Sequence, residues 1–211
     1  MNRRNDALLR LASLRERNEL DGERRSAMRG RFAALAGRTD YHDRVITSHN
    51  LFPTPPAIVL RMIAVADIRP EHRLLEPSAG TGHILSALPR GCKTVVVEIC
   101  AKLQAHLYEQ YPHVLLRAGD FLTKTATDLG GLFHRIIMNP PFKQGEDIRH
   151  IAHARTLLEP GGRLVALCYD GVRQHAKLKP MTSSWTPLPP GSFKGEGTTA
   201  GVILLTIDAP P

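Results

Sequence analysis

The amino-acid sequence predicts an α/β fold built on a mostly parallel β-sheet. From Arg73 onward, short apolar runs alternate with stretches whose apolar residues recur at helical spacing, which is typical of repeated β-α units with a sheet covered on both faces. The expected strands are residues 73–76, 93–98, 114–117, 134–138, 163–168 and 201–207. The expected helices are residues 83–88, 101–110 and 147–158. Pro160-Gly161-Gly162 reads as a turn between a helix and a strand, and residues 171–200 are the least regular part.

The first quarter of the chain differs from the rest in composition. Residues 1–47 are expected to form a basic, helical N-terminal extension, and residues 48–211 the main domain. Leu8, Leu11 and Leu14 recur at helical spacing among many arginines. The extension is interpreted as an arm for a phosphate backbone, a dimerising helix pair or a solvated helix on the domain edge, so a monomer and a dimer both stay open.

A loop joins the extension to the main domain over residues 40–56. Pro55 and Pro56 suit the first turn of a helix, where a missing N–H costs nothing. Thr54 is the expected N-cap of that helix. An apolar face then follows at helical spacing.

Composition limits the possible classes of protein. The chain has 211 residues, of which 42% are hydrophobic and 23% charged, so one well-buried domain is expected rather than a disordered chain. No apolar run approaches the roughly 20 residues that span a membrane. Three cysteines without a CxxC pair argue against a disulfide framework and favour a reducing, cytoplasmic setting. A net charge of +8 favours a polyanionic partner such as nucleic acid.

A glycine-rich turn follows the first expected strand. Residues 76–82 read Glu-Pro-Ser-Ala-Gly-Thr-Gly, in which small residues let the backbone approach a ligand closely. A following helix would offer free N–H groups to electronegative atoms. The dinucleotide fingerprint fails here because Leu85 occupies the position of its third glycine, and the phosphate-loop pattern of NTPases is absent.

Acidic residues end the next two expected strands. Glu98 follows three valines and is suited to accept hydrogen bonds from two ribose hydroxyls, although a solvated carboxylate would look the same. Asp120 can accept from the amino group of an adenine whose ring packs on Phe121. A turn-forming Asp is the alternative for Asp120.

Asn139-Pro140-Pro141-Phe142 leaves the apolar run of residues 135–138. Two prolines cannot continue a sheet ladder, because they lack the N–H and have a fixed φ. The backbone is therefore rigid where an amide and an aromatic ring emerge at a strand's carboxyl end, which is where open α/β sheets bind ligands. This arrangement favours a flat heterocycle that carries an amino group.

These four motifs, taken in order, resemble those of class I S-adenosylmethionine-dependent methyltransferases. The Asn-Pro-Pro-Phe motif is similar to that of DNA adenine-N6 enzymes, and the whole layout resembles small methyltransferases of phages and mobile elements. Phe52-Pro53-Thr54-Pro55 resembles the segment that closes over the methionine part of the cofactor in that group. The resemblance covers about residues 48–170 and implies a Rossmann-like, seven-stranded sheet whose last strand is antiparallel.

The resemblance also implies roles for individual residues. The implied cofactor, S-adenosylmethionine, would contact Phe52, Pro53, Thr54, Glu76, Pro77, Ser78, Ala79, Gly80, Gly82, Glu98, Ile99, Asp120, Phe121 and Asn139. The implied catalytic residues are Asn139, Pro140, Pro141 and Phe142. In this mechanism the Asn139 side-chain oxygen and the Pro140 carbonyl accept the two hydrogens of an exocyclic amine, which frees its lone pair, while Phe142 stacks on the base. Positioning and preorganised electrostatics then carry catalysis.

The expected substrate is adenine N6 in DNA, which must leave the base stack to reach such a site. Adenine in RNA and a protein glutamine remain alternatives, as does a non-catalytic binding module. The chain has no room for a separate recognition domain, so weak sequence specificity is expected. Cytosine-C5 chemistry is disfavoured because no cysteine lies in a Pro-Cys loop.

The remaining polar residues carry weaker expectations. A basic segment that carries Trp185 and Phe193 could grip phosphates and stack a neighbouring base, or it could be a solvated loop with Trp185 in a small core. The expected nucleic-acid contacts are Lys143, Arg173, Lys177, Lys179, Trp185 and Lys194. His150 and His153, at helical spacing, are expected to be surface residues, and no metal site is expected because no third ligand is evident. Cys168 is expected to be a packing residue.

Overall fold

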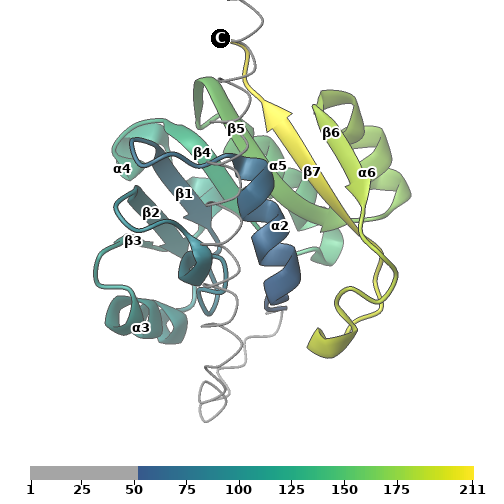
Figure 1. The fold of residues 1–211 in the computed structure, drawn as a ribbon, viewed down its shortest axis with the longest axis horizontal. Coiled ribbons are helices and arrows are strands. Elements are labelled where there is room, and N and C mark those ends of the chain that lie inside the picture. Colours follow the sequence, from purple (N-terminus) through teal and green to yellow (C-terminus); the bar gives the residue numbers. More distant parts are fainter. Residues whose placement is uncertain (1–51) are drawn as a thin grey trace, which may run out of the picture. The chain divides into compact units, whose positions relative to one another are not determined.

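The computed structural model describes residues 52–211, so the expected N-terminal helices and the boundary at residue 47 lie outside the described residues. Within this part of the chain, seven strands form one sheet in the order β3-β2-β1-β4-β5-β7-β6 (Figure 1). The strands are β1 (Arg73–Pro77), β2 (Lys93–Glu98), β3 (Leu115–Ala118), β4 (Phe133–Met138), β5 (Leu158–Tyr169), β6 (Ser184–Pro187) and β7 (Val202–Asp208).

Strand directions confirm the expected mixed sheet. β1, β2, β3, β4 and β5 pair in parallel, whereas β7 pairs antiparallel with both β5 and β6. β1 lies between β2 and β4, so the strands that precede the motifs are direct neighbours. Their carboxyl ends therefore meet along one edge of the sheet, and the order of strands reverses there between β1 and β4, a position that favours ligand binding.

Helices cover both faces of this sheet. The α-helices are α2 (Pro56–Ala66), α3 (Ala101–Gln110), α4 (Ala126–Leu129), α5 (Glu146–Arg155) and α6 (Val172–Lys177). Ile151 and Ala154 of α5 belong to the main buried cluster, together with alternate residues of the central strands. α2 packs against β4 and β5 on the other face (Figure 1). These strands can serve both faces because successive side chains of a strand point to opposite sides of the sheet.

Two expected helices differ from the structure. The regular helix expected over residues 83–88 was wrong, because only a 3₁₀ turn, Leu85–Ala87, forms there. Leu88 has extended φ/ψ of −65° and 145°, as expected of a residue that precedes a proline, so a helix cannot continue. The helix expected over residues 147–158 ends at Arg155, and β5 begins at Leu158.

The predicted turn at residues 160–162 is a bulge inside β5. The register of β4 with β5 jumps from Phe133–Leu158 to Arg135–Arg163, which leaves residues 159–162 opposite a single residue. Gly162 is required there, since a Cβ would lie 2.8 Å from the carbonyl oxygen of Glu159. The bulge therefore lengthens the strand beyond its expected start at residue 163.

The segment of residues 171–200 is more regular than expected, because it contains α6 and the edge strand β6. The sequence Ser-Trp-Thr-Pro of β6 has no alternating apolar pattern, and a proline is tolerated only at such an edge. β6 forms because β7 presents its free edge to it, with Trp185 opposite Leu205. Among residues 52–211, no helix has the length and apolar character needed to cross a membrane.

Candidate functional site

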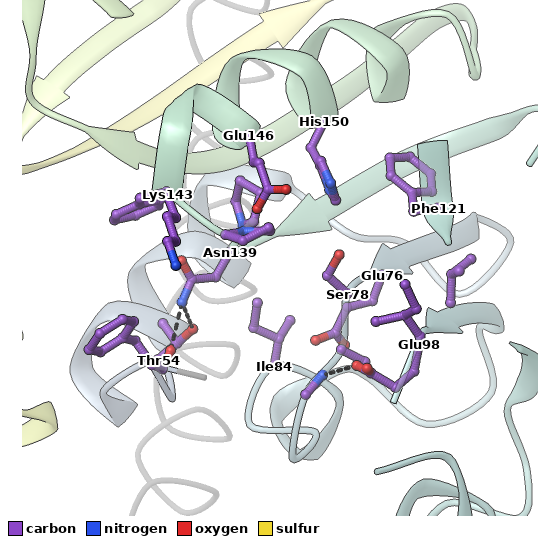
Figure 2. Close-up of a pocket in the computed structure, with 18 of the residues that line it drawn as sticks. Thr54, Glu76, Ser78, Ile84, Glu98, Phe121, Asn139, Lys143, Glu146 and His150 are labelled. Atoms are coloured by element: carbon purple, nitrogen blue, oxygen red, sulfur yellow. Dashed lines mark hydrogen bonds between the residues drawn. The ribbon is translucent and has the colours of Figure 1, made fainter. Parts of the chain in front are cut away.

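A pocket of about 940 Å³ lies at the carboxyl ends of β1 to β5. Most of the predicted site residues line it, namely Phe52, Pro53, Thr54, Glu76, Ser78, Ala79, Gly80, Glu98, Ile99, Asp120, Phe121, Asn139, Pro140, Pro141, Phe142, Lys143 and Arg173. Figure 2 shows them converging from separate elements on one space. Pro77 and Gly82 are absent from this lining, as are Lys177, Lys179, Trp185 and Lys194.

The glycine turn is held to the end of β2 by its own backbone. The N–H groups of Ser78 and Ala79 donate to the Val97 carbonyl at 2.8 and 3.2 Å. Ser78 has a φ of +63°, which is rare for a residue with a side chain. The strained backbone at Ser78 is held in place by the surrounding structure. The turn therefore has one fixed conformation beside the pocket.

Gly82 serves packing in this turn. Its φ is +82°, and a Cβ would lie 2.6 Å from the Tyr111 ring. The Tyr111 hydroxyl donates to the Gly82 carbonyl at 3.0 Å. The glycine is thus needed for the approach of α3 to the turn, whereas its predicted contact with a cofactor stays a prediction.

The Glu98 carboxylate is a rigid acceptor. It is 4% exposed, and its two oxygens accept from the N–H groups of Gly80 at 2.8 Å and Cys100 at 2.9 Å. Each carboxylate oxygen has two lone pairs, so both oxygens can accept a further hydrogen bond. The side chain therefore joins the ends of β1 and β2 and can still bind two hydroxyl groups.

Glu76 is a second buried acid beside Glu98. It is 3% exposed, and its Oε2 atom has no hydrogen-bond partner. Burial raises the pKa of Glu76 well above its usual range, and the neighbouring Glu98 carboxylate raises it further. A cation bound in the pocket beside this carboxyl group would stabilise its ionised form and provide a partner for Oε2 (Figure 2).

The Asn139 amide has a fixed orientation. Its Nδ2 atom donates to the Phe52 carbonyl at 3.0 Å and to the Thr54 hydroxyl at 3.1 Å (Figure 2). Both amide hydrogens are thereby used, and Oδ1 is left as an acceptor. The side chain of Thr54 makes no cap hydrogen bond to α2, whose N-cap is Pro55, so the expected capping role was wrong.

Asp120 forms a turn and also lines the pocket, whereas its contact with an adenine amino group stays a prediction. Its Oδ1 atom accepts from the Leu122 N–H at 2.9 Å, which caps a 3₁₀ turn, and its side chain also lines the pocket. Phe121 is 2% exposed, and its ring contacts His150 and His153. Ile99, by contrast, is 68% exposed and lines the pocket, so it can pack on a flat ring.

His150 is not the surface residue that was expected. It is 7% exposed, it lines the pocket, and its Nδ1 atom has no hydrogen-bond partner. Burial lowers the pKa of His150 to about 4, against the opposing effect of the Asp120 carboxylate. His153 is half-buried, and its Nε2 atom lies 2.9 Å from the Lys124 carbonyl. Residues 52–211 contain no group of three or more side chains suited to hold a metal ion.

Sequence reasoning missed one wall of the pocket. It comprises Tyr169 at the end of β5, Gln174 on α6, and Thr198 and Ala200 before β7, whereas Phe193, which also lines the pocket, was named as part of the basic segment. Asp147, which is fully buried, holds this wall by accepting from the Tyr169 N–H at 3.0 Å and from Gln174 Nε2 at 2.9 Å. An aromatic residue directly after the expected strand of residues 163–168 was the available signal for Tyr169.

The predicted nucleic-acid contacts separate into two groups. Lys143 and Arg173 are exposed and lie at the pocket. Lys177, Lys179 and Lys194 are exposed but do not line it. Trp185 packs against the main core, and its ring makes an edge contact with the His175 ring at a centroid distance of 5.1 Å. Its position therefore agrees with the alternative prediction that Trp185 is a packing residue. Cys168 is fully buried in that core, as expected.

Comparisons with known proteins agree on the fold. No protein-family model matches the chain, and no curated protein does. TrmN from Thermus thermophilus is 20% identical with a TM-score of 0.58 over 72% of this chain, which spans only about half (48%) of that protein. A dimethyladenosine transferase from Plasmodium falciparum is 16% identical, with a TM-score of 0.57 over 75% of this chain and 63% of its own. The glycopeptide N-methyltransferase MtfA, complexed with S-adenosyl-L-methionine, is 13% identical, with a TM-score of 0.55 over 80% and 99% of the two chains.

These likenesses define the fold as the Rossmann-like fold of class I methyltransferases. Sequence identities of 20% or less establish only that the chain shares this fold. Cofactor, reaction and substrate follow from the chain's own pocket.

Proposed function

We propose that this chain is an S-adenosylmethionine-dependent methyltransferase that acts on the exocyclic N6 of adenine in DNA. The observation that carries the proposal is the Asn139 amide, whose two hydrogens are held by Phe52 and Thr54 so that its oxygen is free to accept from an amine. The motif begins directly after β4, on the edge that also carries the glycine turn and Glu98.

The residues of the pocket fit the proposed cofactor. Glu98 can accept from the two ribose hydroxyls, and Asp120 with Ile99 can hold the adenine ring. The unsatisfied Glu76 carboxyl suits the ammonium group of the methionine end. When bound, S-adenosylmethionine supplies an electrophilic methyl group on sulfur. Solved relatives in fold include MtfA with this molecule bound, which supports the choice.

The chain's contribution to the reaction is positioning and electrostatics. The lone pair of an exocyclic amine is delocalised into its ring, which makes the nitrogen a poor nucleophile. Asn139 Oδ1 and the Pro140 carbonyl accept its two hydrogens, so that nitrogen gains tetrahedral character and its lone pair points away from the ring system. Because Asn139 is held in advance by Thr54, little reorganisation accompanies the transfer.

Target binding involves the aromatic and basic residues at the mouth of the pocket. Phe142, which belongs to the same motif as Asn139, would stack on the base, and Phe193 and Tyr169 also line the pocket. Lys143 and Arg173 are exposed there and can contact phosphates. A base inside a duplex must be flipped out to enter such a pocket. The overall charge of +8 supports a nucleic-acid substrate.

The test is methyl transfer from labelled cofactor to matched substrates. Unmethylated duplex DNA, single-stranded DNA, structured RNA and a glutamine-containing peptide would be compared, followed by nucleoside analysis of the product. Label in N6-methyladenine of DNA is expected. RNA adenine is the second candidate, since a dimethyladenosine transferase shares the fold. Label confined to RNA or to peptide would overturn the DNA assignment, and binding of cofactor without any transfer would favour a binding module.

A further inference from the structure

His150 remains unexplained by the roles assigned so far. It extends from α5 into the pocket, between Glu146 on its own helix and Phe121 across the space (Figure 2). Its side chain is more than nine-tenths buried, yet Nδ1 has no partner. An unsatisfied buried polar atom is costly, and a leucine or phenylalanine would fill the same space without that cost. A ligand that supplies the missing hydrogen bond would account for the residue.

The chemistry of the imidazole narrows the class of ligand. Burial keeps the ring neutral near pH 7, because it lowers the pKa to about 4. A neutral imidazole has one N–H donor and one acceptor nitrogen. It therefore suits an uncharged heterocycle or a hydroxyl group, and it has no charge with which to bind a phosphate or a carboxylate.

The position of His150 narrows the class of ligand further. The centroids of the His150 and Phe121 rings lie 5.7 Å apart, and the Asp120 carboxylate affects the pKa of His150. Because Asp120 and Phe121 follow β3, His150 lies beside the carboxyl end of that strand. The proposed methionine end is elsewhere, at Glu76 on β1. Ile99, which follows β2, also lines the pocket and exposes an apolar side chain that can cover a ring face. Adenosine has an aromatic ring face, which Ile99 can cover, and polar atoms that can hydrogen-bond to His150.

We propose that His150 hydrogen-bonds to the adenosine part of the bound cofactor from the α5 side of the pocket. The assignment rests on the proposed function, because it requires an adenosine-containing cofactor. It adds a contact from α5 to a cofactor site that otherwise comprises residues at the ends of β1 to β4 and the segment before α2. His150 is thus a binding residue, and its effect on transfer would follow from cofactor affinity.

Calorimetric binding to the full chain tests the contact without relying on activity. The ligands are S-adenosylhomocysteine and 5′-methylthioadenosine, which share the adenosine part and differ at the amino-acid end. His150→Phe keeps a ring of similar size and removes both nitrogens. His153→Phe is the matched control, because His153 lies one helical turn further on and contacts the same Phe121 ring, yet does not line the pocket.

In His150→Phe, Kd is expected to rise about tenfold for both ligands, which corresponds to the loss of one hydrogen bond. Kd in His153→Phe should stay within about twofold of wild type. Equal affinities in wild type and His150→Phe would overturn the assignment while leaving the proposed function intact. If wild type bound neither ligand, the proposed function itself would fail, and this assignment with it.

Nitrogen-15 spectra of the wild-type histidine rings give an independent readout if His150→Phe does not fold. A ring resonance of His150 should shift when S-adenosylhomocysteine saturates the protein, since a nitrogen without a partner acquires one. The His153 resonances should move much less, because its Nε2 already lies near the Lys124 carbonyl. Unchanged His150 resonances at saturation would contradict the proposal.

Discussion

The Asn139 side chain donates to the Thr54 hydroxyl at 3.1 Å across 85 residues of sequence. Thr54 is 3% exposed, so this hydrogen bond is shielded from water. Together with the Phe52 carbonyl, it fixes which end of the amide is the acceptor. A residue just before α2 thereby helps to set the orientation of the proposed catalytic side chain.

Thr54→Val should reduce turnover by about tenfold, because it removes one acceptor that orients the amide and keeps a similar volume. Thr54→Ser retains the hydroxyl and should stay close to wild type. Steady-state rates and cofactor Kd would be measured for both. A Thr54→Val enzyme with wild-type turnover would show that the Phe52 carbonyl alone orients the amide.

Asn139→Ala should lower turnover by at least about 100-fold, as does the removal of a preorganised hydrogen-bonding group from other active sites. Cofactor Kd should change little, because the ribose and adenine contacts remain. Calorimetry with S-adenosylhomocysteine and single-turnover transfer separate the two effects. Normal transfer by this variant would remove the basis of the proposed mechanism.

Glu76 should release a proton when the cofactor binds. Its pKa is raised in the free protein, chiefly by burial, so the folded state retains a proton above the ordinary pKa of 4.5. An ammonium group beside it would lower that pKa, so the proton leaves and affinity rises with pH. Calorimetry in buffers of different ionisation enthalpy measures the proton count.

Glu76→Gln provides the comparison, since it should abolish this proton release and weaken binding. It should also stabilise the free protein at neutral pH. The folded pKa lies above the unfolded one, so the group's contribution to stability is complete below the unfolded pKa and is lost as pH rises through the folded pKa. Exposed Glu71→Gln is the control. Identical proton release by wild type and Glu76→Gln would contradict this role.

His150 should make the fold sensitive to mild acid. Its folded pKa of about 4 lies below the ordinary histidine pKa of 6.5, so the unfolded chain binds a proton first and stability falls as pH drops through that interval. Between pH 7 and pH 5 the loss should be on the order of 1–2 kcal/mol. Urea unfolding at both pH values measures it. The loss should shrink in His150→Phe, and an equal loss in both proteins would assign the effect to other groups.

Much of the site could be predicted from sequence, because its residues directly follow strands that carry local apolar patterns. The runs that end at Glu76, Glu98 and Met138 mark β1, β2 and β4 without reference to the rest of the chain. Parallel strands then bring their carboxyl ends to one edge. Local geometry also explains why the helix predicted over residues 83–88 was wrong. Pro89 forces the preceding Leu88 into an extended conformation, which a helix cannot include.

The chain's order of apolar runs, glycine turn and Asn-Pro-Pro-Phe motif therefore determined the fold class and the edge at which the site forms. Tertiary structure alone decided that Thr54 holds Asn139, that His150 turns inward and that Phe193 reaches the pocket. The sequence does not predict these contacts, since the environment of each residue depends on partners far away in sequence. Burial and hydrogen bonding across such distances exist only once the sheet has assembled.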